Sequence, residues 1–263
     1  MRRQDKPGSK PAEPLALLLI LLIALAFHPL MAVSGATAAA IGGRVFFDSD
    51  GDGVQDADEA GLPDVSITLE GQDEGGHLVQ RSALTAQDGS FQFPDLPAGT
   101  FVIQETDPVG YLSTTSNAIS VTISSTQNYS EAHFGDALPI TLWGVVFEDL
   151  DADGEQGLNE PGLPDVRLDL YADPDGDGQP APSQAPLRTT YTSADGLYFF
   201  RQLLPGPYVL QETDPERFFS LTPNRVAQFL RSCEVGNEYN HHFADIRLAA
   251  IWYFPLVLNS GPS

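Results

Sequence analysis

The sequence has few means of cross-linking itself and few positive charges. Its only cysteine is Cys233, so no internal disulfide can form. Its only lysines are Lys6 and Lys10, and residues 41–263 carry nine arginines against 34 acidic residues, a net charge of −25. Such a surface repels nucleic acid and anionic lipid, because neutralising phosphates requires clustered Lys and Arg. It attracts cations, and a bound metal is one way to stabilise an exported fold that has no disulfide.

The first forty residues follow the order of a secretory signal peptide. Basic residues come first, an apolar run covers 15–27, and small residues fill 34–40. The apolar run has thirteen residues and ends at His28-Pro29, whereas crossing a bilayer requires roughly 20. We therefore predict a signal peptide over 1–40, cleaved near Ala38 to Ala40, and a secreted or cell-surface location.

The rest of the chain is a tandem duplication. Residues 43–65 align without gaps on 144–166, with fourteen of the 23 positions identical. "QDGSFQFPDLPAGTFVIQETDP" (87–108) then recurs as "ADGLYFFRQLLPGPYVLQETDP", and "HFGD" recurs as "HFAD". Three blocks in the same order indicate two units of about 100 residues. The predicted boundaries are domain 1 over 41–136, a linker over 137–141, domain 2 over 142–246 and an apolar tail over 247–263.

Each unit has the pattern of an all-β domain. Val65, Ile67 and Leu69 alternate with polar residues, and so do Val166 and Leu168 in the second unit. Turn sequences containing Pro and Gly separate such stretches every 8 to 12 residues, and no window predicts an amphipathic helix. The sequence predicts two tandem immunoglobulin-like β-sandwiches of about seven strands each.

One acidic loop occurs in both units. "DSDGDGVQDADE" (48–59) and "DLDADGEQGLNE" (149–160) both fit D-x-[DN]-x-[DN]-G-x5-E, a calcium-loop pattern. Oxygens at positions 1, 3 and 5 converge as the chain curls, the glycine permits the turn, a backbone carbonyl follows, and the last carboxylate closes the shell. The predicted ligands are Asp48, Asp50, Asp52, Val54 (carbonyl), Asp56 and Glu59 in the first loop, and Asp149, Asp151, Asp153, Glu155 (carbonyl) and Glu160 in the second.

The ligand set favours calcium. All the ligands are oxygens, which argues against zinc, and an irregular loop suits calcium better than octahedral magnesium. Position 9 is Asp56 in the first loop and Gly157 in the second, where a water substitutes. Pro63 and Pro164 follow the loops closely, so no exiting helix is expected and the loops lie between strands. The alternative is a solvated acidic turn.

A third acidic group appears only in the second unit. Asp173, Asp175 and Asp177 have calcium-loop spacing before Gly178, but Gln184 stands where the closing carboxylate would be. Two interpretations stay open, a weaker calcium site and a plain hairpin turn.

The segment 248–258, "LAAIWYFPLVL", is too short to span a bilayer. It is a last strand, an exported tail or an attachment signal.

At these motifs the sequence resembles the SdrD B-like domain of bacterial surface proteins, within the Cna-B-like group. The resemblance implies calcium-stabilised Ig-like or prealbumin-like sandwiches, used in series as a stalk that displays adhesive regions. Some Cna-B relatives form a Lys–Asn isopeptide bond assisted by a glutamate. No lysine follows Lys10, so Glu105 and Glu212 have no such bond to promote. The sequence also departs from the group in having no LPxTG-type sorting motif.

No catalytic motif accompanies these features. HExxH and GxSxG are both missing, so we predict that the protein is not an enzyme. A transition-metal site at Cys233, His241, His242 and Asp245 is disfavoured because the first unit has no equivalent cysteine. We expect an exported calcium-binding spacer of the cell surface or extracellular matrix. The alternative is an adhesin-type module that binds a surface or matrix protein or a polysaccharide.

Overall fold

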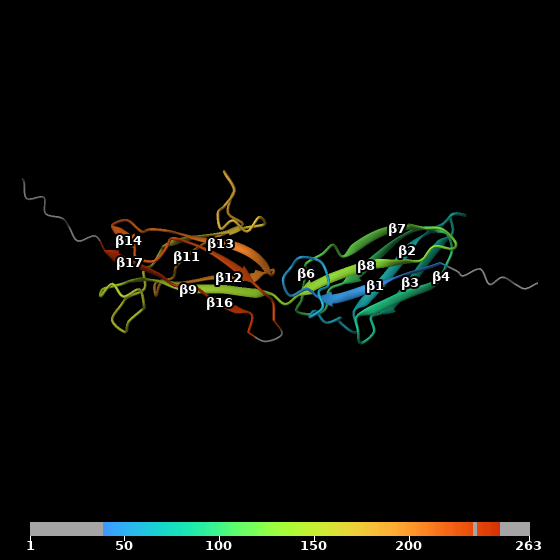
Figure 1. Cartoon of the computed structure of the whole chain (residues 1–263), viewed down its shortest axis with the longest axis horizontal. Coiled ribbons are helices and arrows are strands. Elements are labelled where there is room, and N and C mark those ends of the chain that lie inside the picture. Colours follow the sequence, from blue (N-terminus) through green and yellow to red (C-terminus); the bar gives the residue numbers. More distant parts are fainter. Residues whose placement is uncertain (1–38, 234–235, 248–263) are drawn as a thin grey trace, which may run out of the picture. The chain divides into compact units, whose positions relative to one another are not determined.

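Two β-sandwiches make up the described part of the chain, which covers residues 39–233 and 236–247 in a computed structural model (Figure 1). These residues form seventeen strands and no helix, which confirms the predicted all-β fold. None of them lies in a helix long and apolar enough to cross a membrane. The predicted signal peptide, apart from Ala39 and Ala40, and the tail beyond Arg247 lie outside the described residues.

The first sandwich has two four-stranded sheets. One has the order β4-β1-β8-β6 and the other β3-β2-β5-β7. β1 pairs with β8 in parallel, and every other pair in this sandwich is antiparallel. The strands are β1 (Ala39–Phe47), β2 (Ser66–Asp73), β3 (Leu78–Leu84), β4 (Ser90–Leu96), β5 (Gly99–Thr106), β6 (Leu112–Ser113), β7 (Ala118–Ile123) and β8 (Tyr129–Ala137).

The second sandwich repeats this topology. Its sheets have the orders β12-β9-β17-β14 and β11-β10-β13-β15, and β16 also pairs with β9. β16 and β17 together occupy the place of β8, interrupted at His241 and His242. The strands are β9 (Ile140–Glu148), β10 (Arg167–Ala172), β11 (Arg188–Tyr191), β12 (Leu197–Leu203), β13 (Gly206–Thr213), β14 (Phe218–Ser220), β15 (Arg225–Leu230), β16 (Glu238–Asn240) and β17 (Phe243–Arg247).

Each sandwich encloses its own apolar core. The alternation along the strands places Ile67, Leu69 and Phe101 in the first core, and Leu168 and Leu210 in the second. Fully burying a large apolar side chain stabilises by about 1.5–3 kcal/mol. The two cores therefore give each sandwich its own source of stability.

The duplication extends to unusual backbone angles. Asp64 and Asp165 have φ of 59° and 58°, and Asp95 and Gln202 both have 56°. These are left-handed conformations that residues with a side chain seldom adopt, so their recurrence reflects the same turns in both units. Gly61 is needed for a different reason, since a Cβ there would lie 1.9 Å from the Asp88 carbonyl oxygen.

The strands fall close to the predicted domain boundaries. β1 begins at Ala39, two residues before the predicted start of domain 1, and Ala39 is fully buried. Of the predicted linker 137–141, only Leu138 and Pro139 lie between β8 and β9. The domain limits and the cleavage position stay predictions.

Candidate metal centres

The first acidic loop connects the two sheets of its sandwich. It begins where β1 ends at Phe47 and leads to β2, and Gly61 returns to bridge Phe46. Asp48 is 0% exposed and Glu59 is 6% exposed, so the two ends of the loop are buried. The loop therefore lies between β-strands, as predicted from Pro63, and not between helices.

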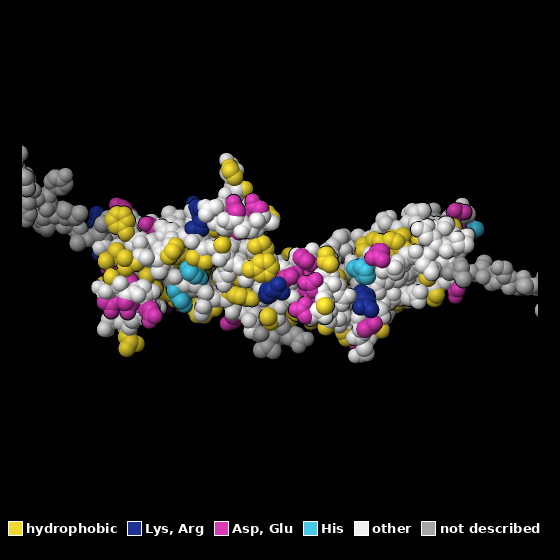
Figure 2. Space-filling view, viewed as in Figure 1, with side chains coloured by type: hydrophobic (Ala, Val, Ile, Leu, Met, Phe, Trp, Pro, Cys, Tyr) yellow, Lys and Arg dark blue, Asp and Glu magenta, His cyan; other side chains and the backbone are white. Residues whose placement is uncertain are grey.

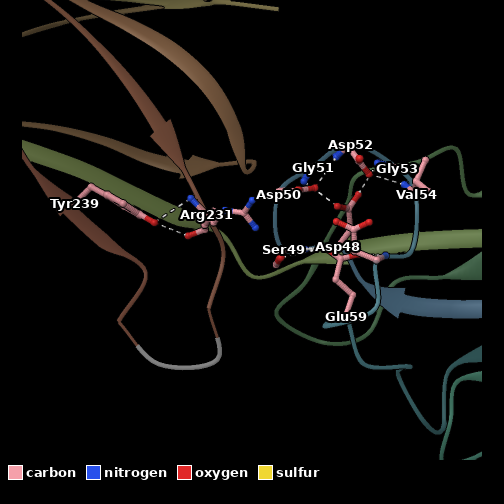
Figure 3. Close-up of polar contacts among 11 residues, drawn as sticks. Asp48, Ser49, Asp50, Gly51, Asp52, Gly53, Val54, Glu59, Arg231 and Tyr239 are labelled. Atoms are coloured by element: carbon pink, nitrogen blue, oxygen red, sulfur yellow. Dashed lines mark hydrogen bonds and ion pairs between the residues drawn. The ribbon is translucent and has the colours of Figure 1, made fainter. Parts of the chain in front are cut away.

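Backbone N–H groups orient the two terminal carboxylates. Gly51 donates to Asp48 Oδ1 at 2.7 Å, and Gly53 donates to Asp48 Oδ2 at 3.0 Å. Ser49 N–H donates to Glu59 Oε1 at 2.7 Å (Figure 3). Asp56 N–H donates to Glu59 Oε2 at 3.1 Å. An ionised carboxylate can accept at about four lone-pair sites, so these contacts leave acceptor capacity on both side chains.

Asp50 completes this group. One carboxylate oxygen each from Asp48, Asp50 and Glu59 lies within 4.8 Å of the others. Asp50 also forms an ion pair with Arg231 of the second sandwich, 3.4 Å between Oδ2 and Nη2 (Figure 3). Ser232 N–H donates to the Ser49 carbonyl at 2.8 Å. The first loop is therefore in contact with the segment that follows β15.

The second loop has the same terminal geometry in a more open setting. Ala152 and Gly154 donate to Asp149 at 2.6 and 2.8 Å, while Leu150 and Gly157 donate to the two oxygens of Glu160. Asp149, Asp151 and Glu160 form a group of mutually close carboxylates. Asp151 is exposed, and repulsion from Asp153 raises its pKa.

Several predicted ligands lie outside these two groups. Asp52 Oδ1 accepts from Val54 N–H at 2.7 Å, and Asp153 Oδ1 accepts from Glu155 N–H at 2.8 Å. These are local turn contacts, and Asp56 is likewise exposed. The roles of Asp52, Val54, Asp56, Asp153 and Glu155 as ligands stay predictions.

The third acidic group does come together. Asp173, Asp175 and Asp177 each contribute an oxygen within 4.8 Å of the others, in the loop that follows β10. Asp173 is buried, and its Oδ1 has no hydrogen-bond partner. Gln184 binds backbone groups at Ala172 and Ala181, so the loop is closed by an amide in place of a carboxylate.

Two further carboxylate clusters did not appear among the predicted sites. Glu105, Asp107 and Asp136 form one, and Glu212, Asp214 and Asp245 form its repeat. Burial and the neighbouring carboxylates raise the pKa of Glu105 to about 8 and that of Asp136 to about 7. For the same reasons, the pKa values of the strongly interacting Glu212 and Asp245 are also raised.

A signal for these clusters was present in the sequence. Along β5 the buried positions alternate strictly, so Glu105 is in phase with the core residues Phe101 and Ile103. A glutamate in phase with a hydrophobic face is expensive to bury and indicates a special environment. Its counterpart Glu212 has the same phase along β13.

The residues considered for a transition metal do not assemble. Cys233 is exposed, and neither it nor His241 or His242 joins any close group of ligand atoms among the described residues. His242 Nδ1 accepts from Val145 N–H at 3.1 Å, which fits a structural role. Burial lowers the pKa of both histidines.

One exposed face of the second sandwich carries aromatic side chains. Trp143 of β9 stacks on Phe199 of β12, with 6.4 Å between ring centroids and 23° between planes. Arg201 Cζ lies over the Phe199 ring, 4.3 Å from its centroid, and the His242 ring meets Trp143 edge-on. Phe199 is 37% exposed.

Figure 2 shows hydrophobic and acidic groups scattered over a surface with few basic side chains.

The fold and the acidic loops define a repeated β-sandwich module of bacterial surface proteins. The SdrD B-like domain family matches residues 39–134 and 140–237, and the chain belongs to this family. The predicted resemblance is thereby confirmed, and the chain is an extracellular or cell-surface protein built of structural domains.

Relatives and solved structures are in keeping with this assignment. The serine-aspartate repeat-containing protein D of Staphylococcus aureus strain Newman is 31% identical over 199 residues, 71% of this chain and 14% of that protein. The bone sialoprotein-binding protein of S. aureus strain MRSA252 is 29% identical over 180 residues, 64% of this chain and 15% of that protein. The chain thus spans about a seventh of these relatives.

The minor pilin GBS52 of Streptococcus agalactiae is a similar solved structure, at 13% identity with a TM-score of 0.33 over 81% of this chain and 97% of that one. The Bacillus anthracis TIE protein has a TM-score of 0.34 at 14% identity, over 80% of this chain and 34% of that one. Scores this low carry no argument about function.

Proposed function

We propose that the protein is an exported spacer whose two sandwiches are made rigid by calcium bound in the acidic loops. The observation that carries this proposal is the repeated placement of a buried aspartate and a glutamate at the two ends of each loop. An all-oxygen donor set of this kind suits a hard cation such as calcium. Without one, the carboxylates repel one another and favour opening of the loop.

The contacts of the first loop extend the proposal beyond one sandwich. Ser49 and Asp50 belong to this loop and contact Ser232 and Arg231 after β15. The Asp50–Arg231 ion pair is partly exposed through Arg231, and such pairs contribute roughly 0–1 kcal/mol. This ion pair matters more for position than for energy. Calcium that orders the loop would also fix Ser49 and Asp50, which contact the second sandwich.

Chelation of the chain from Ala38 tests this function. Calcium should stabilise by about 2.7 kcal/mol per site at 100 times its dissociation constant, so a chelator should lower the melting temperature and added calcium restore it. Glu59→Gln together with Glu160→Gln should remove the part of this response that comes from the two loops. Asp58→Asn is the control, since Asp58 lies exposed in the same loop and is not a predicted ligand. A melting curve that calcium does not move would refute the proposal.

A second candidate function rests on the aromatic face. Stacked aromatics with one exposed edge are a common platform for binding, here Trp143 and Phe199 with Arg201 beside them. They support the alternative that the second sandwich engages a polysaccharide or a surface protein. A glycan and protein array, run with and without calcium, separates this binding role from a purely structural one.

A further inference from the structure

The cluster around Glu105 contains buried carboxylates that lack the hydrogen bonds that buried polar groups normally make. Glu105 is 3% exposed and Asp136 is 0% exposed, yet none of their four carboxylate oxygens has a hydrogen-bond partner within residues 39–233 and 236–247. Buried polar groups in folded proteins are almost always paired, and an unpaired buried carboxylate is strongly destabilising. No arginine in the described part of the chain forms an ion pair with either residue.

Further oxygens surround the two carboxylates. Asp107 brings a carboxylate oxygen within 4.8 Å of both, and its Oδ1 is held by Ser113 Oγ at 2.9 Å and by the Asn117 amide. Thr114 Oγ1 and Asn117 Oδ1 are also buried without partners. The cluster is therefore rich in hard oxygen acceptors and poor in donors, which is the composition of a calcium site.

The second sandwich repeats this arrangement. Glu212 Oε1, both oxygens of Asp245, and Asn224 Oδ1 are buried with no N–H or O–H donor in hydrogen-bonding geometry among the described residues. Glu212 and Asp245 also interact strongly with each other. Ser220 and Asn224 donate to Asp214, as Ser113 and Asn117 do to Asp107. Two occurrences of the same donor-poor cluster, at matching positions of a duplication, are hard to explain as chance.

The position of each cluster in the fold suggests what it does. Glu105 lies in β5 of one sheet and Asp136 in β8 of the other, and Glu212 and Asp245 lie likewise in β13 and β17. A group bound by both carboxylates therefore joins the two sheets of a sandwich. Cys233 is the only cysteine, so no disulfide can do this.

We propose that each sandwich binds a second hard divalent cation, of the calcium type, between Glu105, Asp107 and Asp136 and between Glu212, Asp214 and Asp245. This site is separate from the acidic loop but adjacent to it, because Asp48 N–H donates to the Asp136 carbonyl at 2.9 Å. The same bond recurs from Asp149 to Asp245 at 2.8 Å. The cation links the two sheets at the point where the loop leaves its strand.

Counting bound calcium in the chain from Ala38 tests this proposal. Glu105→Gln with Glu212→Gln keeps the side-chain shape and should reduce the calcium bound at saturation by two ions per chain, measured by equilibrium dialysis with elemental analysis. Glu131→Gln with Glu238→Gln removes the same charge from exposed positions and should leave the number unchanged. Glu59→Gln with Glu160→Gln should remove the loop ions and keep the two cluster ions. The two double variants therefore test the loop proposal and the cluster proposal independently.

Diffraction from the unaltered chain gives a measurement that does not depend on how the variants fold. Crystals grown in calcium should show anomalous density between the carboxylates of Glu105 and Asp136, and between those of Glu212 and Asp245. If these positions hold no ion, or if the double Gln variant binds as many ions as the unaltered chain, the clusters bind protons instead of a cation and the proposal is wrong.

Discussion

The two sandwiches have the same strand order but different surroundings at equivalent positions. The first loop has both terminal carboxylates buried and Asp50 half-buried, whereas in the second loop Asp151 is exposed and Glu160 half-buried. The first loop also has one more carboxylate at position 9, where Asp56 corresponds to Gly157. Duplication therefore preserved the geometry of the loop and altered the charge and the burial around it.

The buried clusters differ in a similar way. Glu105 has no hydrogen bond to either oxygen, while Ser220 Oγ donates to Glu212 Oε2 at 3.3 Å. Thr114, whose hydroxyl is buried and unpartnered, corresponds to Leu221 in the second unit. The first cluster is thus the less satisfied of the two when no cation is present.

The largest expected difference is in the pH dependence of the chelated protein. The pKa of Glu105 is raised to about 8 and that of Asp136 to about 7, so the folded state binds protons more tightly than the unfolded chain. The stability that protonation provides is therefore lost as pH rises from about 5 to 8, by on the order of 2 kcal/mol. Urea unfolding in chelator at pH 6 and pH 8 should show this loss.

Single variants show which sandwich dominates this dependence. Asp136→Asn should flatten the pH dependence more than Asp245→Asn does, because the pKa of Asp136 is raised to about 7 and that of Asp245 only to about 6. Calcium should reduce the dependence in the unaltered chain by displacing the protons. Equal slopes for the two variants would contradict the comparison between the clusters.

A smaller effect is expected from exchanging position 9 of the loops. Gly157→Asp should tighten calcium binding in the second loop, and Asp56→Gly should weaken it in the first, because more ligand charge favours the cation. We expect about a tenfold change in each dissociation constant, equivalent to about 1.4 kcal/mol. Calorimetric titration measures both, with Asp58→Asn as the control. If neither substitution changes affinity, position 9 is not a ligand.

Much of the fold followed from patterns that are local in the sequence. Alternating apolar residues predicted strands such as β2, and the repeated blocks predicted a second sandwich with the same topology. The loop ends could be predicted because Asp48 and Glu59 are only eleven positions apart and the spacing itself brings them together. Short-range geometry of this kind does not depend on how the sheets pack.

The Glu105 cluster could not be predicted in the same way. Glu105 and Asp136 are far apart in the sequence and lie in different sheets, so only the packing of the sandwich brings them together. The contacts of Asp50 and Ser49 with Arg231 and Ser232 are equally non-local. The alternation along β5 indicated that Glu105 is buried, but it gave no partner.

The smallest predicted effect is on stability, and it concerns the aromatic face of the second sandwich. Trp143 and Phe199 correspond to Gly42 and Gln92, which pair in the same register and line a groove together with His133. Phe199→Gln gives the second sandwich the residue of the first and should cost about 0.5–1.5 kcal/mol through the lost stacking on Trp143. Calcium binding should be unchanged, since Trp143 and Phe199 lie within β9 and β12 and belong to none of the acidic groups.

Binding measurements on the Phe199 variant test whether the aromatic face binds a ligand. If the aromatic face binds a polysaccharide or protein, Phe199→Gln should abolish the array signal while Phe219→Gln, an exposed phenylalanine of β14, leaves it intact. If both variants behave like the unaltered chain, the stacked pair serves only to cover the sheet. The aromatic pair then adds packing to the second sandwich and no binding function, and the spacer role applies to both sandwiches.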